Sequence, residues 1–506
     1  MAFKIFFSQT FLFFLFAIVL PSIWTVLHIQ KKPLSNQRIS IPQTNTSRYV
    51  FGICLAFFIC VQFYGIYFFK LRLMADNSTD LINYASNIPF QTQLPDHLRF
   101  SYFFDKILLL PAFYLHLPMN TVGIIYCLND ALFYLIISCL ILFLTGRYDY
   151  ASVVLAMPVL LLGISFYFID NMFMLGAILM VYLSVYKYLR DGHLRSMLLF
   201  LCLFFIVWSH PIVFIAVGVF FVGLYKSKEQ IVKDKWLFLF LVVNLAFKFS
   251  LLDGYDKGRI KDLNGNWDWE FTFQIIVEFC TYYWYLILSL GAVYVLGWKT
   301  KKWNDYLALL VIPLMLYFCC TQLVRMYHYN FQKYIFPFSL LLLAEGIFFI
   351  TNYEGRFKKL VLVFVCIVLL SGVKTNFYDL HANFVNRVRV LETLSDICSK
   401  KDPSQTKWFV KRDSLRHLGD CILSDESIVY SALNNLPNTI QLVCEVDSLS
   451  YEVYNCPYDY YYTNPHEAIP AKWLSSYYFH FKQGSYKELV VDSNMRKILG
   501  TGQLSD

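Results

Sequence analysis

Residues 121–145 read TVGIIYCLNDALFYLIISCLILFLT, an apolar run in which Asp130 is the one charged side chain. An α-helix rises about 1.5 Å per residue, so a run of this length can cross the roughly 30 Å hydrocarbon core of a bilayer. Similar apolar blocks lie along the chain on both sides of this one. The pattern therefore predicts an all-α polytopic membrane bundle.

The composition supports the same interpretation. Of the 506 residues, 58% are hydrophobic, 19% are aromatic and only 15% are charged. Soluble globular chains carry about 25% charged residues, and disordered chains combine low hydrophobicity with high net charge, so both classes are excluded. We delimit twelve apolar segments, at residues 10–29, 49–69, 121–145, 152–168, 171–187, 195–208, 211–225, 236–252, 273–297, 304–322, 333–352 and 357–374.

The connections between these segments alternate in charge. One set is basic and comprises residues 30–48, 187–195, 226–235, 298–302 and 353–359. The other set is neutral or mixed and includes residues 70–106, 253–270 and 323–332. With this segment count, every basic connection falls on one side of the membrane, which by the positive-inside rule is the cytoplasm.

The first segment decides whether the chain crosses eleven or twelve times. It is interrupted by Pro21, and no small-residue cleavage site follows it, so we do not expect a removable signal peptide. If residues 10–29 cross the membrane, the N-terminus lies outside. If they lie in the interface, the N-terminus is cytoplasmic. We favour twelve crossings, and both alternatives put the C-terminus outside.

The chain divides into two predicted domains. Residues 1–374 form the transmembrane domain, and residues 375–506 have the mixed composition and the length of one small domain, which we expect to be extracytoplasmic and α/β. This domain contains Cys398, Cys421, Cys444 and Cys456. In an oxidising compartment four cysteines suggest two disulfides, with three possible pairings. Four free thiols are the alternative.

The long first outer loop, residues 70–120, contains the first candidate site. It opens with MADNSTDLINYA at residues 74–85, where Asp76 and Asp80 are four residues apart. On a helix this spacing places both on one face, and a carboxylate beside apolar walls has a raised pKa and can act as a general base. The alternative is that the two acids solvate or cap the start of a helix.

A second candidate site is the sequence RMYHYNFQKYIFP at residues 325–337, also on the outer side. Arg325, His328 and Lys333 are cations interleaved with aromatic residues. Arginine pairs with phosphate through two hydrogen bonds and lysine through a point charge, and neighbouring aromatic rings can stack on a sugar. The alternative is an aromatic belt with cations that extend to lipid headgroups.

Isolated polar residues are weaker candidates. His210 lies in a short outer turn, where a histidine is more often structural. Asp130, Lys248, Glu278 and Glu345 fall within apolar segments, where an insertion scale assigns a charge a cost of about 2.5–3.5 kcal/mol. Such residues pair with one another or line a transport pathway, and the sequence leaves both possibilities open.

This layout resembles the GT-C superfamily of integral-membrane glycosyltransferases, which includes the protein mannosyltransferases and the bacterial lipid A aminoarabinose transferases. Those proteins have a long first outer loop that begins with an acidic residue, about a dozen spans and, often, an outer C-terminal domain. The matching features here are Asp76, Asp80 and Tyr84-Ala85, Ser209-His210-Pro211, and Lys333-Tyr334-Ile335-Phe336-Pro337, which looks like Arg-Tyr-x-x-Pro. This chain departs from the family pattern in the wider spacing of its acids and in having Lys333 where the family has arginine.

The resemblance implies transfer of a sugar from a polyprenyl-phosphate donor on the outer face of the membrane, with inversion at the sugar. Asp76 is the expected base and Asp80 the second choice. Cations that stabilise the phosphate leaving group would replace the general acid of a glycosidase, and those expected are Arg325, His328, Lys333 and Arg99. The expected substrate-binding residues are Tyr84, His97, His210, Tyr327 and Tyr334.

The wider expectations follow from the same resemblance. The acceptor is a glycan, a lipid or a protein, the surroundings are membrane lipids, and no nucleic-acid partner is expected. The location is the bacterial inner (plasma) membrane, with the active site outside, in cell-envelope glycan biosynthesis. Some family members use a divalent metal and others do not, and the sequence does not choose between them.

Two other functions are compatible with the sequence. A polysaccharide polymerase or ligase also joins lipid-linked glycans with many spans and an outer loop, but that loop typically lies late in the chain. A transporter or flippase would use the intramembrane charges as pathway groups, yet transporters often show two related halves, and no internal repeat is visible here.

Overall fold

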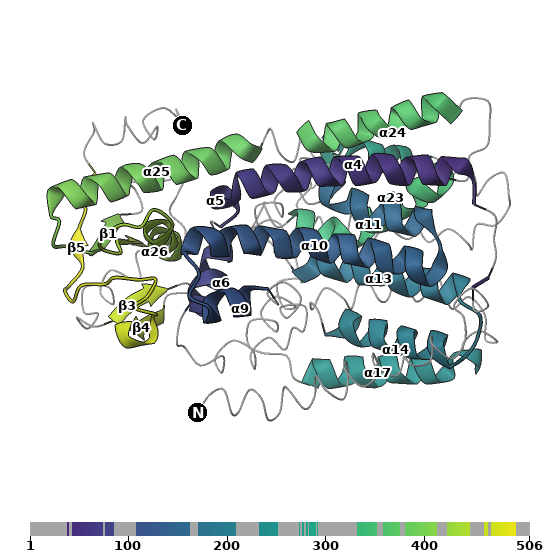
Figure 1. Cartoon of the computed structure of the whole chain (residues 1–506), viewed down its shortest axis with the longest axis horizontal. Coiled ribbons are helices and arrows are strands. Elements are labelled where there is room, and N and C mark those ends of the chain that lie inside the picture. The colour runs from purple at the N-terminus through teal and green to yellow at the C-terminus, as the bar shows by residue number, and fades with distance from the viewer. Residues whose placement is uncertain are drawn as a thin grey trace.

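The computed structural model describes residues 38–39, 43–73, 76–85, 108–161, 171–208, 232–250, 331–351, 358–374, 380–411, 423–445, 460–463 and 467–491, with isolated residues between 273 and 291. This part of the chain is mostly helical, and Figure 1 shows long helices side by side with a smaller mixed region at one end.

Two described helices are long and apolar enough to cross a membrane, α4 (Asn45–Tyr67) and α10 (Met119–Thr145). Helix α4 begins where the hydroxyl of Thr44 accepts a hydrogen bond from the backbone N–H of Ser47, as an N-cap residue does. Helix α10 ends at Gly146, whose φ of 72° is left-handed, a conformation that glycine adopts without steric cost.

Six further apolar helices accompany these two. They are α11 (Tyr148–Leu160), α13 (Asn171–Tyr188), α14 (His193–Val207), α17 (Lys235–Ser250), α23 (Phe331–Thr351) and α24 (Lys358–Val373). Together with α4 and α10 they form what we call the helical body, and they overlap eight of the predicted segments. The predicted segments 10–29, 211–225 and 304–322 lie outside the described residues, and 273–297 is described only at isolated positions.

Helix α11 lies at the centre of the helical body. All of its residues from Asp149 to Leu160 are buried, and α4, α10, α13, α23 and α24 all pack against it. Large apolar side chains also point outward along the peripheral helices, among them Phe63 on α4, Val243 on α17 and Leu360 on α24. Extended apolar surface of this kind marks contact with a membrane or another protein.

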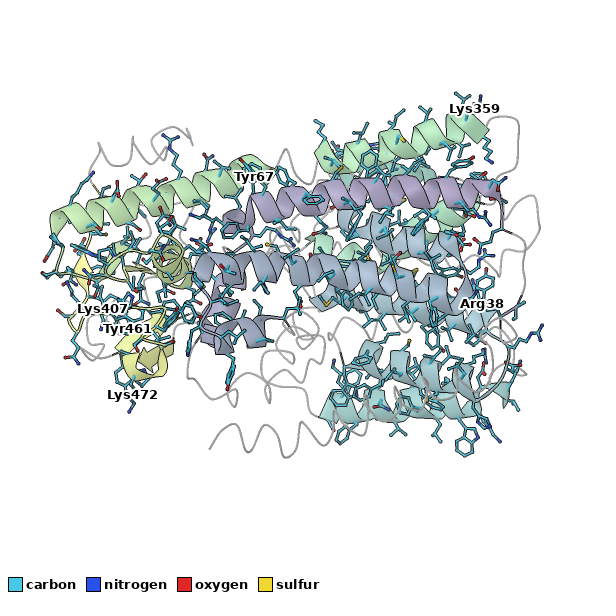
Figure 2. The ribbon with its side chains drawn as sticks, viewed as in Figure 1. Arg38, Tyr67, Lys359, Lys407, Tyr461 and Lys472 are labelled. Atoms are coloured by element: carbon cyan, nitrogen blue, oxygen red, sulfur yellow. The ribbon has the colours of Figure 1, made fainter. Side chains whose placement is uncertain are left out.

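The described basic connections gather at one end of the helical body, which we call the basic end. There the hydroxyl of Thr44 donates a hydrogen bond to the carbonyl oxygen of Thr351, and Arg38 pairs with Leu189 through a β-bridge. Arg38 and Lys359 mark this end in Figure 2. Segments far apart in sequence therefore meet where alternating crossings would bring them together.

The opposite end, the distal end, contains the first outer loop and the C-terminal region. The loop contributes α5 (Phe69–Arg72), α6 (Asp76–Ala85) and α9 (Leu109–Tyr114). The C-terminal region contributes α25 (Leu380–Lys401), β1 (Lys407–Lys411), α26 (Leu423–Leu433), β2 (Gln441–Glu445), β3 (Tyr460–Thr463), β4 (Glu467–Pro470), a 3₁₀ turn (Ala471–Trp473) and β5 (Lys487–Glu488). Figure 1 shows the strands and α26 beyond the tip of α10, with α6 and α9 beside the start of α10.

The C-terminal strands form two small sheets. Strands β2, β1 and β5 lie in that order and run parallel, with Trp408 opposite Leu442. Helix α26 connects β1 to β2, as a parallel pair requires, and Trp408, Phe409 and Val410 are all buried, as expected of a parallel strand covered on both faces. Strands β3 and β4 form an antiparallel pair.

The first outer loop and the C-terminal region share one apolar core. Leu81 and Ile82 of α6 and Phe113 of α9 belong to the same buried cluster as Leu391 of α25 and Ile428 of α26. The domain boundary at residues 374 and 375 stays a prediction. The shared core nevertheless means that residues 70–120 and the C-terminal region stabilise one another.

The prediction of two disulfides is wrong. Cys398 is a free thiol, fully buried in the shared core of the distal end. At most one disulfide can then form among the remaining three cysteines. Cys421 and Cys456 and the side chain of Cys444 lie outside the described residues.

Candidate active site at the distal end

The turn that leads from α4 into the first outer loop is fixed by a buried ion pair. Arg72 at the end of α5 donates to the carboxylate of Asp130 on α10 over 2.9 Å, and both side chains are buried. Gly123 of α10 permits the close approach, since a Cβ there would lie 2.5 Å from Cδ1 of Leu73. The end of α5, four residues before α6, is therefore held against the first half of α10.

Helix α6 has one buried face. Ser78, Leu81, Ile82 and Ala85 are buried, at the spacing of a single helix face. With 3.6 residues per turn, positions 76 and 80 both fall on the opposite face. The predicted helix and the shared face of the two acids are thus present, and that face is the one turned away from the shared core.

Helix α26 holds α6 from the side. The hydroxyl of Thr79 donates a hydrogen bond to Oδ2 of Asp425 over 2.5 Å, and Asp425 is fully buried. The neighbouring Glu426, also fully buried, accepts a 2.6 Å hydrogen bond from Nε of Arg387 on α25. Buried carboxylates are stable only when they are paired and hydrogen-bonded, so these contacts fix α26, and through it α6.

Two more polar contacts join the distal elements. Nζ of Lys70 donates to Oδ1 of Asn434 over 3.0 Å, and the hydroxyl of Tyr478 donates to the carbonyl oxygen of Leu117 over 3.1 Å. Burial, assisted by the neighbouring Tyr477, raises the pKa of Tyr478 to about 12, so this hydroxyl keeps its proton at neutral pH. The C-terminal region is therefore bonded to both ends of the first outer loop.

The predicted site residues fall into two groups. Asp76, Asp80 and Tyr84 lie on α6, and Lys333 and Tyr334 lie in the first turn of α23; only the backbone of these five is described. The remaining predicted site residues lie outside the described residues, namely His97, Arg99, His210, Arg325, Tyr327 and His328.

The direction of α23 puts its first turn at the same end as α6. Thr351, the last residue of α23, is bonded to Thr44 at the basic end, and a helix of 21 residues extends about 30 Å. Helix α23 also packs on α4, the helix that leads into α5 and α6. Lys333 therefore lies at the distal end, as the acids do.

Two of the intramembrane charges have partners within the helical body. Asp130 binds Arg72, as described above, and Nζ of Lys248 donates to the carbonyl oxygen of Val207 over 2.7 Å. Lys248 also lies 6.0 Å from the ring centre of Trp208. Glu278 lies outside the described residues. Asp130 and Lys248 thus have structural contacts that account for their burial.

No sequence pattern indicated the contacts that fix α6. Asp425 and Glu426 stand at the start of α26, where acids are common because they interact well with the helix dipole. Only their full burial marks them as unusual. Among the described residues, no group of three His, Cys, Asp or Glu side chains could hold a metal ion.

Fold and site together define a mostly helical protein with two helices able to cross a membrane and an acid-bearing helix fixed at one end. No family model matches the chain, and neither a curated protein nor a solved structure matches it. Its function has to be inferred from these residues and from the GT-C resemblance.

Proposed function

We propose that the protein is an integral-membrane glycosyltransferase of the GT-C type, which transfers a sugar from a polyprenyl-phosphate donor to an acceptor outside the cytoplasm. The helical body would be a polytopic bundle in the bacterial plasma membrane. The basic end would face the cytoplasm, and the distal end, with the C-terminal region as an α/β domain, would face outward.

The outward-facing apolar side chains of α4, α10, α17 and α24 support the membrane placement. Charged groups in the helical body support it as well, because those described are concentrated near its two ends. Arg72 and Asp130 lie at the distal end, whereas Arg147 and Asp149 pair at the basic end. A helical body built for a bilayer is apolar between two polar ends.

One observation carries the assignment of the site. Positions 76 and 80 share the face of α6 that is turned away from the core, while the opposite face is buried and Thr79 is bonded to Asp425. Acids that merely cap a helix need no such fixed support. A catalytic base does, because transfer depends on holding the base within hydrogen-bond reach of the hydroxyl it deprotonates.

The proposed reaction is a single displacement. The acceptor oxygen forms a bond to the anomeric carbon of the sugar, and the bond from that carbon to the phosphate oxygen breaks. Asp76, or Asp80 in its place, takes the proton of the acceptor hydroxyl. The leaving group is polyprenyl phosphate, whose charge Lys333 and the predicted cations Arg325, His328 and Arg99 would stabilise.

Lys333 at the distal end is consistent with this arrangement, since base and leaving-group cations must lie on opposite sides of one anomeric carbon. The predicted substrate-binding residues Tyr84 on α6 and Tyr334 on α23 lie at that end too. A transporter would instead use the intramembrane charges, and the contacts of Asp130 and Lys248 give no support to that alternative.

The test is an assay of transfer with membranes that contain the protein, using a panel of polyprenyl-phosphate sugars. We expect Asp76→Asn to lower turnover by about 10²–10⁴-fold without loss of protein, and Asp80→Asn to do so if Asp80 is the base. Asp396→Asn, which changes an exposed acid on α25, is the matched control. Near-normal turnover in both α6 variants would show that the site is wrong.

A further inference from the structure

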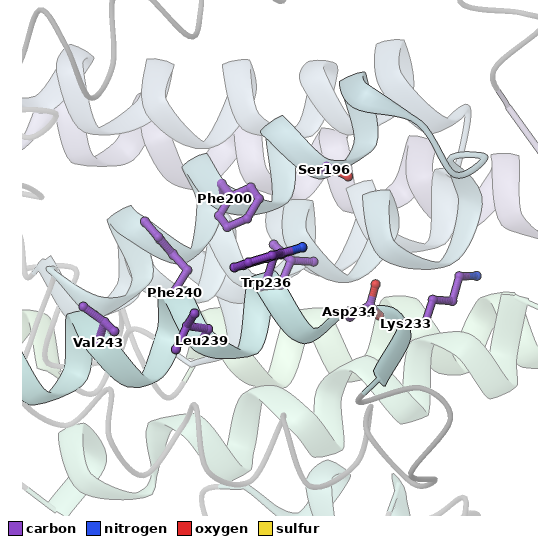
Figure 3. Close-up of a pocket in the computed structure, with 9 residues that line it drawn as sticks. Ser196, Phe200, Lys233, Asp234, Trp236, Leu239, Phe240 and Val243 are labelled. Carbon is purple, nitrogen blue, oxygen red and sulfur yellow. The ribbon is translucent and has the colours of Figure 1, made fainter.

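A groove lies between α14 and α17, on the outside of the helical body. It has a volume of about 590 Å³, within the roughly 300–1,000 Å³ typical of small-molecule sites. Phe200 of α14 and Phe240 and Val243 of α17 form its apolar part, and Ser196 and Lys233 lie toward one end. Figure 3 shows the apolar side chains in a row that ends at these two polar residues.

The acid beside the groove is already satisfied by the protein. Asp234 is buried, accepts a 3.0 Å hydrogen bond from the hydroxyl of Tyr186 and lies 3.8 Å from Nη1 of Arg195. Asp234 lines the groove, but its carboxylate is engaged by these two side chains of the helical body. It presents no unpaired carboxylate to a molecule in the groove.

Two lysines, Lys233 and Lys235, are exposed at the polar end of the groove, which we call its mouth. Lys233 is 61% exposed and binds Asp191, itself 60% exposed, over 2.7 Å, and an exposed pair of this kind contributes only about 0–1 kcal/mol. Lys235 lies 5.6 Å from the ring centre of Trp236, and both are exposed. Arg195 is buried and is itself bonded to Asp191 over 3.0 Å. Counted with Lys233 and Lys235 against Asp191 and Asp234, it leaves one net positive charge, which lies on exposed lysines that an anion can reach.

The length of the groove fits one membrane leaflet. From its first residue, Lys235, to Val243, helix α17 advances eight residues, which is about 12 Å and fits within half of the roughly 30 Å hydrocarbon core. Lys233 lies at the basic end, where it pairs with Asp191, and Val243 lies at the other end of the row of lining residues in Figure 3. Trp236 near the mouth is an aromatic residue of the kind that concentrates at membrane interfaces.

We propose that this groove binds one phospholipid with an anionic headgroup, from the leaflet at the basic end. The phosphate lies against Lys233 and Ser196, and one acyl chain lies along Phe200, Phe240 and Val243. The inference rests on the membrane placement proposed above and not on the transfer chemistry. The donor site is at the distal end, in the other leaflet, so the two lipids do not compete.

The experiment uses the full-length protein purified in detergent and titrated with phosphatidylglycerol or with phosphatidylcholine of the same acyl chains. Native mass spectrometry counts the bound lipids. We expect one phosphatidylglycerol to bind more tightly than the others and more tightly than phosphatidylcholine. Lys233→Glu should weaken this binding at least about fivefold, the effect of one lysine near an anionic lipid surface, and Val243→Trp should abolish it by filling the groove.

Two variants of α24 serve as matched controls, because α24 is also apolar and, like α17, begins at the basic end. Lys359→Glu and Val363→Trp change exposed residues there and should leave the tight lipid in place. The proposal would be overturned if phosphatidylglycerol and phosphatidylcholine bound with equal affinity. It would also be overturned if the α24 variants weakened lipid binding as much as Lys233→Glu and Val243→Trp do. A photo-crosslinking residue at position 240 gives a second readout, and crosslinks to residues 209–231 instead of lipid would overturn it too.

These outcomes are separable from failure of the proposed function. Loss of transfer in Asp76→Asn with an intact lipid site supports both proposals, and a lipid site without any transfer activity rejects only the transferase. Extraction of the protein from membranes by alkaline carbonate would reject the membrane placement, and with it the lipid site.

Discussion

Gly123 is the residue at which the turn after α4 meets α10. A Cβ at this position would lie 2.5 Å from Leu73 and 2.8 Å from Phe69, closer than van der Waals contact allows. We expect Gly123→Ala to lower the free energy of unfolding by about 1–3 kcal/mol through overpacking. A thermal unfolding scan of the detergent-solubilised protein measures this change.

The control for this prediction is Gly52→Ala on α4, where a Cβ meets nothing within 4 Å. Because alanine favours a helix over glycine by about 1 kcal/mol, that variant should be neutral or more stable. If the two variants change the free energy of unfolding by the same amount, the turn at Gly123 is less tightly packed than the distances indicate.

Cys398 is a second residue with a clear expectation. Burial raises the pKa of its thiol to about 12. The folded protein should therefore resist iodoacetamide at this position at pH 8, and only unfolded protein should be alkylated. Mass spectrometry of the peptide that contains Cys398 measures the reaction, with Ser404→Cys as an exposed control that must react readily.

The raised pKa of Cys398 also sets a pH dependence. Its contribution to stability is complete below pH 9, where the thiol is protonated in the folded and unfolded chains alike. Between pH 9 and about pH 12 the unfolded thiol ionises and the folded one does not, so the free energy of unfolding should fall over this range. Cys398→Ala should reduce that dependence on pH.

Helix α6 is the element on which the proposed chemistry depends. Its hydrogen bond from Thr79 to Asp425 links it to a helix 346 residues further along the chain, and hydrogen bonds to charged groups contribute about 1.5–3 kcal/mol. We expect Thr79→Val to speed amide hydrogen exchange in residues 76–85 by about tenfold or more, because local opening becomes easier. The same variant should lower transfer activity.

Thr393→Val is the control for α6. Thr393 is half-buried on α25, and its hydroxyl bonds only the carbonyl oxygen of Arg389 one turn earlier among the described residues. That variant should leave exchange in residues 76–85 unchanged. Unchanged exchange in Thr79→Val would mean that the shared apolar core alone holds α6.

The orientation of the whole molecule is tested with two lysines. Lys472 and Lys359 are exposed at opposite ends of the protein (Figure 2). In a background without other reactive cysteines, a membrane-impermeant maleimide should label Lys472→Cys in intact cells. It should label Lys359→Cys only after permeabilisation. The reverse labelling pattern would place the distal end in the cytoplasm. The proposed site would then lie on the opposite side of the membrane from the proposed donor sugar.

Sequence reasoning succeeded where the information is local. Gly146 ends α10 one residue after the predicted segment, and the four-residue spacing of Asp76 and Asp80 places them on one face of α6. Helical period, capping residues and apolar length are properties of neighbouring residues, so they can be read from a short window. A short window of sequence could not show that Cys398 is a free thiol, because a disulfide depends on distances between residues far apart in sequence.

The sequence by itself determined that the chain is rich in apolar helices. It located seven of those described to within about four residues, whereas α11 ends eight residues before the predicted segment does. Only the tertiary structure decided that α6 is held by Asp425, that Asp130 pairs with Arg72, and that the first outer loop shares a core with the C-terminal region. The physical reason is that helix formation reflects periodicity over a few turns, whereas these contacts join segments 58 to 346 residues apart, and no local pattern specifies which buried charge meets which partner.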